Sequence, residues 1–223
     1  MTDWLVRTAM FPLHLTKNAA RLLRSALMAD FLTAYSLLQA DKAAVIDDRP
    51  DATVTTLTYG QLNEQANRLA NVLLDLGARP GDTKVVWCGQ NSPGLVVMIN
   101  AARKLGVTAV PLNYRLSDEE AVYVTDHCDA AIVYLDTELA PMFDRIRGEL
   151  PQVQHFLVFD GAAPEGMIDA DAAMAAASPA EPEVPAATEA GATMIYTSGT
   201  TGKPKGAFRR GAGNPAQVVA MLV

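Results

Sequence analysis

The chain contains 223 residues, 50% of them hydrophobic, so it can bury a sizeable core and cannot be disordered as a whole. Its formal net charge of −7 and isoelectric point near 4.9 would repel a nucleic-acid backbone, so nucleic acid is not expected as a partner. The two cysteines, Cys88 and Cys128, show neither C-x-x-C nor metal-ligand spacing, so we expect buried, reduced thiols in a cytoplasmic protein.

Residues 1–42 are predicted to form a basic amphipathic helical leader. The first 28 residues contain four basic residues and a single acid, Asp3, which gives a net charge of +3. Apolar residues are interspersed among these charges. These charges interrupt the segment before the roughly 20 apolar residues that a membrane span needs, and no compact apolar stretch with a cleavage site marks a signal peptide. Two interpretations stay open: a helix packed on the domain, or a helix on a membrane surface that gives residues 1–28 a weak peripheral contact.

Residues 43–159 are predicted to form an α/β subdomain. Its first elements are two β-prone runs, 43–47 and 54–57, which flank a turn rich in Asp and Pro and therefore predict a hairpin. A helix follows, because Thr58 and Gln61 form a capping box at its start and Gly77 ends it. One apolar stripe at helical spacing predicts its buried face: Leu62, Ala66, Leu69, Ala70, Leu73 and Leu76.

The rest of this subdomain alternates between strands and helices. The predicted strands are 84–88, 108–112, 130–134 and 155–159. The predicted helices are 93–105, 117–126 and 138–147. Ser92 is the candidate cap of the first helix, and the second opens on a capping box. Strands separated by helices of this length pair in parallel through right-handed crossovers. The predicted fold class is therefore α/β, a layered and mostly parallel sheet with flanking helices.

Residues 160–190 are predicted to be a Pro/Ala-rich acidic connector. Prolines recur among alanines and acids, and one short helix is expected at 169–176. No residue pattern in this stretch indicates chemistry.

Residues 191–223 contain the clearest functional pattern of the chain. Residues 196–206 read Tyr-Thr-Ser-Gly-Thr-Thr-Gly-Lys-Pro-Lys-Gly. Glycines let backbone amides approach an anion, hydroxyls add donors and lysines add positive charge, so the run suits a polyphosphate. It fails the Walker pattern, because Pro204 rather than Ser or Thr follows Lys203. The apolar flanks predict a strand, a loop and a second strand, and the last residues predict the start of a helix.

This run resembles, over its whole length, the phosphate-binding signature of the AMP-forming acyl-CoA synthetases of the adenylate-forming superfamily. Two earlier segments are similar to the same family: 57–73 resembles its T-Y-x-x-L helix, and 104–113 resembles its helix, glycine turn and V-P-L-N strand. The resemblance runs from about residue 43 to the end of the chain. It implies the amino-terminal part of an ATP-dependent fatty-acid–CoA ligase.

The resemblance also implies a two-step reaction on a fatty acid or another carboxylic acid. The acid attacks the α-phosphorus of ATP, pyrophosphate leaves, and the thiol of coenzyme A then captures the acyl-adenylate. The residues implied to contact the phosphates are Thr197, Ser198, Gly199, Thr200, Thr201, Gly202, Lys203 and Lys205. Lys205 corresponds to the more constant lysine of the family, whereas Lys203 stands where the family varies. Thr200 or Thr201 is implied to touch the shell of a bound Mg²⁺ ion.

Other features of that family are not found in these residues. The adenine and ribose site, the Tyr-Gly-x-Thr-Glu segment, and the catalytic lysine of a mobile carboxy-terminal domain are missing, and the final apolar helical pattern is still running at Val223. We therefore expect a chain that is cut short. By itself it should not complete adenylation, unless a companion chain supplies the missing half.

Two alternatives stay open. A non-catalytic phosphate-binding or partner-docking remnant would expose an apolar patch and would bind pyrophosphate without exchange activity. An unrelated phosphotransferase would need a magnesium-binding acid and a base near the loop, for which the sequence offers no motif. The three histidines, His14, His127 and His155, are scattered, and each is expected to be a surface or structurally satisfied residue.

Overall fold

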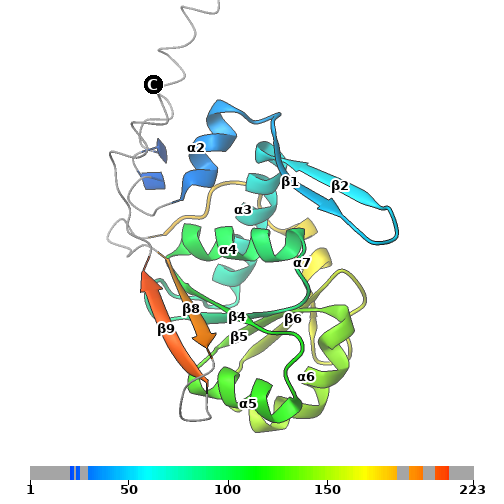
Figure 1. Ribbon diagram of the computed structural model, residues 1–223. Coiled ribbons are helices and arrows are strands. Elements are labelled where there is room, and N and C mark those ends of the chain that lie inside the picture. Colours follow the sequence, from blue (N-terminus) through cyan, green and yellow to red (C-terminus); the bar gives the residue numbers. More distant parts are fainter. Residues whose placement is uncertain (1–20, 23, 26–29, 185–190, 198–203, 211–223) are drawn as a thin grey trace, which may run out of the picture.

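The central feature of the computed structural model is a seven-stranded sheet with the order β7-β6-β5-β3-β4-β8-β9 (Figure 1). The structure describes residues 21–22, 24–25, 30–184, 191–197 and 204–210. The strands are β3 (Lys84–Cys88), β4 (Thr108–Leu112), β5 (Ile132–Asp136), β6 (His155–Phe159), β7 (Ile168–Asp169), β8 (Ala192–Thr197) and β9 (Lys205–Arg210).

Strand pairing in this sheet is parallel from β7 to β8, and only β9 runs antiparallel to its neighbour. Central strands such as Val85–Cys88 and Ile132–Leu135 are buried on both faces, and this explains why they read as unbroken apolar runs. The predicted layered α/β fold with a mostly parallel sheet is confirmed.

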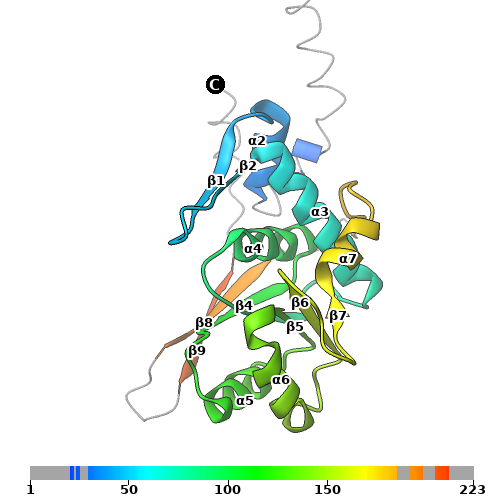
Figure 2. The ribbon, with the colours of Figure 1, turned by 90° about the vertical axis from the view of Figure 1, so that its right-hand side faces the viewer.

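Helices cover both faces of the sheet, as Figure 2 shows. One face carries α3 (Tyr59–Asp75), α4 (Pro93–Leu105) and α7 (Ala170–Ala176), and the other carries α5 (Asp118–His127) and α6 (Ala140–Ile146). Side chains alternate between the two layers: Val85 and Trp87 join the core under α3 and α4, whereas Val86 and Cys88 join the core under α5 and α6.

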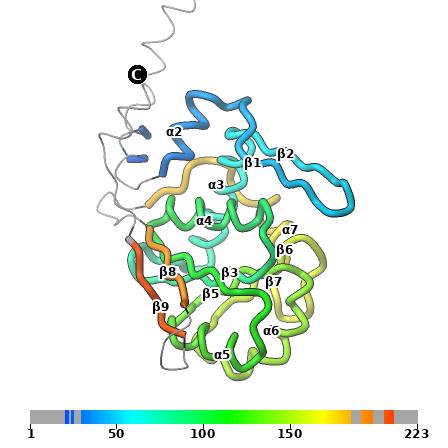
Figure 3. The backbone as a smooth tube through the Cα atoms, viewed as in Figure 1, coloured from blue at the N-terminus to red at the C-terminus, as the bar shows by residue number. Residues whose placement is uncertain are grey.

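The hairpin lies outside this sheet. Strands β1 (Ala43–Asp48) and β2 (Val54–Thr58) form a separate antiparallel pair that projects beyond the helices (Figure 3). It leads directly into α3, whose start has the predicted capping box: Gln61 N–H donates to Thr58 Oγ1, and Thr58 N–H donates to Gln61 Oε1. The predicted stripe packs in the core, and Gly77 follows the helix with φ +86°.

Three sequence predictions need correction. Strand β5 begins at Ile132 rather than at 130, because its ladder with β3 starts at the Val85↔Ile132 pair. The helix predicted at 138–147 is a shorter α6 between two 3₁₀ turns, Thr137–Leu139 and Arg147–Glu149. Ser92 precedes α4, but its side chain makes no capping hydrogen bond.

The connector is more structured than its composition predicts. It contributes the two-residue edge strand β7 as well as α7, which begins at Ala170 behind an Asp169 cap. Residues after α7 run along α3, where Asn67, Arg68 and Asn71 donate hydrogen bonds to connector carbonyls. These side-chain donors satisfy backbone that has no ladder of its own.

Little of the predicted leader is described. Residues 21–22 and 24–25 are helical, and α2 (Phe31–Leu38) begins at an Asp30 cap. Among the described residues, no helix is long and apolar enough to cross a membrane. The division of the chain at residues 42, 159 and 190 stays a prediction.

Candidate functional site

The end of β8 and the start of β9 carry two of the residues implied to bind phosphate, Thr197 and Lys205. The antiparallel ladder pairs Tyr196 with Gly206 and Thr197 with Lys205, so Thr197 and Lys205 stand side by side. Both residues are exposed. The other implied residues, Ser198, Gly199, Thr200, Thr201, Gly202 and Lys203, lie outside the described residues.

Strand β8 ends at the carboxyl edge of the parallel sheet. It pairs with β4 at Thr108↔Ala192 and Ala109↔Thr193 and runs in the same direction. In open α/β sheets, ligands bind outside the carboxyl ends of the strands. The strand-loop-strand prediction for this region is confirmed for its two strands: β8 ends, and β9 begins, at the edge where such a site is expected.

Gly191 sets where β8 enters the sheet. A Cβ atom at this position would lie 2.9 Å from the Ala102 carbonyl oxygen and 2.9 Å from the Arg103 Cα. Both are backbone atoms of α4, which a side chain cannot push aside cheaply. A glycine is therefore needed for the close approach of the chain to the end of this helix.

Helix α5 contacts the end of β8 and the residue that precedes β9. His127 Nδ1 lies 2.7 Å from the Tyr196 hydroxyl, and the Tyr123 hydroxyl donates to the Pro204 carbonyl at 3.4 Å. The sequence predicted only a surface or satisfied role for His127, and this contact satisfies it. Its nearness to the phosphate run was missed, because it depends on packing between distant segments.

The two cysteines are free and buried, as predicted. Burial, with a smaller contribution from the nearby Asp136 charge, raises the pKa of Cys88 to about 12. Burial likewise raises the pKa of Cys128 to about 11. Both thiols therefore stay protonated at neutral pH and are poor nucleophiles.

A second polar region lies at the carboxyl ends of β3, β5 and β6. Gln90 donates to Glu138 at 3.2 Å across the loops that follow β3 and β5. Beside it, a cavity of about 240 Å³ is lined in part by Asp160 and Tyr134. Among the described residues, no group of three or more His, Cys, Asp or Glu side chains is placed to hold a metal ion.

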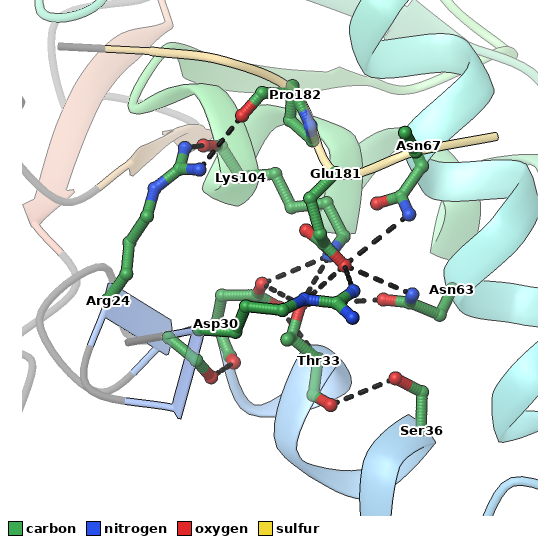
Figure 4. A network of polar contacts seen from close by, with 12 residues as sticks. Arg24, Asp30, Thr33, Ser36, Asn63, Asn67, Lys104, Glu181 and Pro182 are labelled. Carbon is green, nitrogen blue, oxygen red and sulfur yellow. Dashed lines mark hydrogen bonds and ion pairs between the residues drawn. The ribbon is translucent and has the colours of Figure 1, made fainter. Parts of the chain in front are cut away.

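A buried ionic network joins the helical layer to the connector (Figure 4). The Lys104 side chain is only 1% exposed, and its Nζ lies 3.1 Å from Asp30 Oδ2, 2.9 Å from Glu181 Oε2 and 2.5 Å from Thr33 Oγ1. Asn63 also donates to Glu181, at 3.2 Å. Nothing in the sequence of the connector predicts that Glu181 takes part in this contact.

Burial and charge act in opposite directions on Glu181. Burial by itself would raise the pKa of its carboxyl, but the charge of Lys104, together with hydrogen bonds from Lys104 and Asn63, lowers the pKa to about 2. The carboxylate is therefore ionised at neutral pH, and it anchors the connector ahead of β8.

Comparison with known proteins identifies the family. Residues 35–221, most of the chain, match the family described as AMP-binding enzyme. The chain belongs to this family. It is 35% identical over 178 residues to the long-chain-fatty-acid–CoA ligase of Thermus thermophilus, covering 79% of this chain and 32% of that protein. It is 30% identical over 174 residues to a crotonobetaine/carnitine–CoA ligase of Escherichia coli, covering 74% and 32%.

Solved structures agree with this assignment to the AMP-binding enzymes. The anthranilate–CoA ligase AuaEII, in complex with anthranoyl-AMP, is 28% identical with a TM-score of 0.72, over 82% of this chain and 34% of that chain. The inhibitor-bound N-terminal domain of FACL13 from Mycobacterium tuberculosis is 28% identical with a TM-score of 0.69, over 81% and 43%. The resemblance to acyl-CoA synthetases is confirmed, and the chain resembles the amino-terminal part of fatty-acid–CoA ligases. It spans about a third of the length of the curated relatives it matches.

Proposed function

We propose that this chain binds the β- and γ-phosphates of ATP as the amino-terminal part of a fatty-acid–CoA ligase. The observation that carries the proposal is the Thr197↔Lys205 pair at the carboxyl edge of a parallel sheet. It places a hydroxyl and an ammonium group together at the two ends of a glycine-rich loop. Family membership and the ligase relatives support the same assignment.

In this proposal, the loop orients pyrophosphate as the leaving group. Residues Ser198 to Lys203 would offer amides, hydroxyls and a second ammonium group to the phosphate oxygens, and Lys205 would neutralise charge that builds up as the bond to the α-phosphorus breaks. The carboxylic acid attacks that phosphorus, and coenzyme A then takes the acyl group from the adenylate. Mg²⁺ would arrive bound to the phosphates of ATP.

The chain by itself should bind phosphates without completing adenylation. About two thirds of each curated relative has no counterpart in these residues. We propose that a complete site needs those regions, whether from the same polypeptide or from a companion chain.

We further propose a cytoplasmic protein with weak membrane-surface contact through residues 1–28, which would suit a fatty-acid substrate. Flotation with anionic liposomes would test that contact.

Calorimetric titration with pyrophosphate and MgATP tests the phosphate assignment. We expect binding, and we expect Lys205→Met to weaken it about tenfold because it removes one charge-assisted contact. Lys42→Met is the matched control, since Lys42 is an exposed lysine that precedes β1. No binding by the wild type, or equal loss in both variants, would refute the assignment.

ATP–pyrophosphate exchange with a panel of fatty acids tests the second half of the proposal. We expect no turnover from the isolated chain, and robust turnover would contradict its incompleteness. The non-catalytic alternative is tested by replacing the matching third of the Thermus thermophilus ligase with this chain. A folded chimera that catalyses exchange supports a competent phosphate site, and a folded chimera that binds pyrophosphate without exchange supports the remnant.

A further inference from the structure

Strand β8 has limited support from the sheet near its functional end. Its ladder with β4 pairs Ala192 and Thr193, whereas its later residues pair only with the edge strand β9. A two-stranded hairpin that pairs with no further strand is only marginally stable by itself. Some other element must hold the end of β8 if Thr197 is to keep a fixed position.

Helix α5 lies beside that end of the hairpin in both Figure 1 and Figure 2. His127, at its last position, shares the 2.7 Å hydrogen bond with the Tyr196 hydroxyl, and the two rings meet edge to face with centroids 5.7 Å apart. Tyr196 directly precedes Thr197. The helix therefore fixes the residue from which the phosphate-binding run departs.

The same helix reaches the other end of the run. Tyr123 lies one turn before His127, on the same helix face, and their rings are 5.4 Å apart. Its hydroxyl donates to the carbonyl of Pro204, the residue that directly precedes Lys205. The two contacts are thus made to the residues adjoining Thr197 and Lys205.

The Tyr196 ring also contacts its ladder partner on β9. A Cβ atom on Gly206, its ladder partner, would lie 3.2 Å from Tyr196 Cζ, so the ring packs directly against the glycine backbone. Burial is the main cause that raises the pKa of Tyr196 to about 12. The hydroxyl therefore keeps its proton at neutral pH and stays available to His127.

Helix α5 is itself a firm support. Ser117 and Glu120 form a reciprocal capping box at its start. Ala121 and Val124 are buried in the core beneath it, as is Cys128 just after its end. A side chain anchored on such a helix transmits its position to whatever it contacts.

We propose that Tyr123 and His127 are positioning residues, which hold the ends of β8 and β9 so that Thr197 and Lys205 stand ready for a polyphosphate. This inference rests on the proposed function for its ligand, but the fixing of the strand ends stands on contacts alone. A pre-positioned hydroxyl and ammonium pair loses less conformational freedom when an anion binds. The aromatic pair on α5 therefore contributes to affinity without touching the ligand.

Amide hydrogen exchange in the free chain, followed by NMR, tests the fixing of the strand ends. The variants His127→Phe, Tyr196→Phe and Tyr123→Phe each keep a ring and remove one hydrogen-bonding group. We expect faster exchange at residues 195–197 and at Lys205 and Gly206, with unchanged exchange in β3 and β4 as the internal check on folding. His127→Asn, which keeps a hydrogen-bonding atom at the δ position, should restore the wild-type rates.

Pyrophosphate titration of the same variants tests the consequence for binding. We expect dissociation constants about fivefold higher for His127→Phe and Tyr123→Phe, the weight of a single hydrogen bond, and unchanged for the control Tyr35→Phe on α2. Unchanged exchange rates in all three Phe variants would overturn the inference whatever the ligand. Faster exchange with unchanged affinity for pyrophosphate would also overturn the inference. In that case, weaker pyrophosphate binding by Lys205→Met would leave the proposed function standing. A wild-type chain that does not bind pyrophosphate would overturn both.

Discussion

Replacing Glu181 by Gln removes one of the two carboxylates that face the buried Lys104 ammonium. The Glu181 carboxylate lies 2.9 Å from Lys104 Nζ and is largely shielded from water, its side chain being 18% exposed. Its pKa falls from the ordinary 4.5 to about 2, and that difference corresponds to about 3 kcal/mol of folding free energy at neutral pH. We expect Glu181→Gln to lose a comparable amount, because it leaves a buried cation with a weaker partner.

The loss should depend on pH with a definite sign. A carboxylate whose pKa is lowered by folding stabilises the protein fully above the unfolded value of 4.5 and loses that contribution as the pH falls toward 2. Urea unfolding followed by tryptophan fluorescence should therefore give a large difference between wild type and Glu181→Gln at pH 7 that shrinks steadily below 4.5. The control is Glu183→Gln, at an exposed neighbour, which should stay within about 0.5 kcal/mol of wild type.

Two results would refute this account of the network. Equal stability of wild type and Glu181→Gln at pH 7 would mean that the ion pair contributes nothing beyond its desolvation. A difference that stays constant from pH 7 to pH 3 would mean that the variant acts by packing rather than by charge.

Two further predictions concern packing. Gly191→Ala should destabilise the chain by about 1–3 kcal/mol in thermal unfolding, because its Cβ would meet the backbone at Ala102. The control Gly148→Ala, with open space around its Cβ, should not destabilise the chain. Equal melting temperatures of the two variants would contradict the close approach at Gly191. Cys88 and Cys128 should resist Ellman's reagent in the folded chain at pH 8 and react only after unfolding in denaturant. The reason is that their pKa values are raised to about 12 and about 11. Rapid reaction of the native chain would contradict their burial.

Much of the fold follows from local patterns in the sequence. The strands at 84–88, 108–112 and 155–159 match their predicted bounds, because each is an apolar run bounded by polar or turn residues. The capping boxes at Thr58 and Ser117 were equally readable, because all the groups involved lie within four residues. Strand order and the two-residue β7 were not predicted, since they depend on which segments meet after the chain has packed.

The candidate site divides in the same way. An ordered run in the sequence implies the phosphate residues, and their role stays a prediction. The pairing of Thr197 with Lys205 agrees with the two strands predicted around that run. The contributions of His127 and Glu181 had no local signal. Each acts through a partner far away in the sequence, and a lone histidine or glutamate on an exposed segment carries no periodicity or spacing that could reveal the partner.

These two residues act on either side of β8, one in the connector that precedes the strand and one at its last residues. Glu181 ties the connector to Lys104 near the end of α4, and His127 ties α5 to Tyr196 shortly before β8 ends. Between them, the ladder to β4 is short, so the position of Thr197 depends on both attachments. Loss of the first attachment should lower global stability, whereas loss of the second should loosen only the end of β8 that carries Thr197. The two attachments are therefore separable by experiment: the first through the free energy of unfolding, the second through local hydrogen exchange.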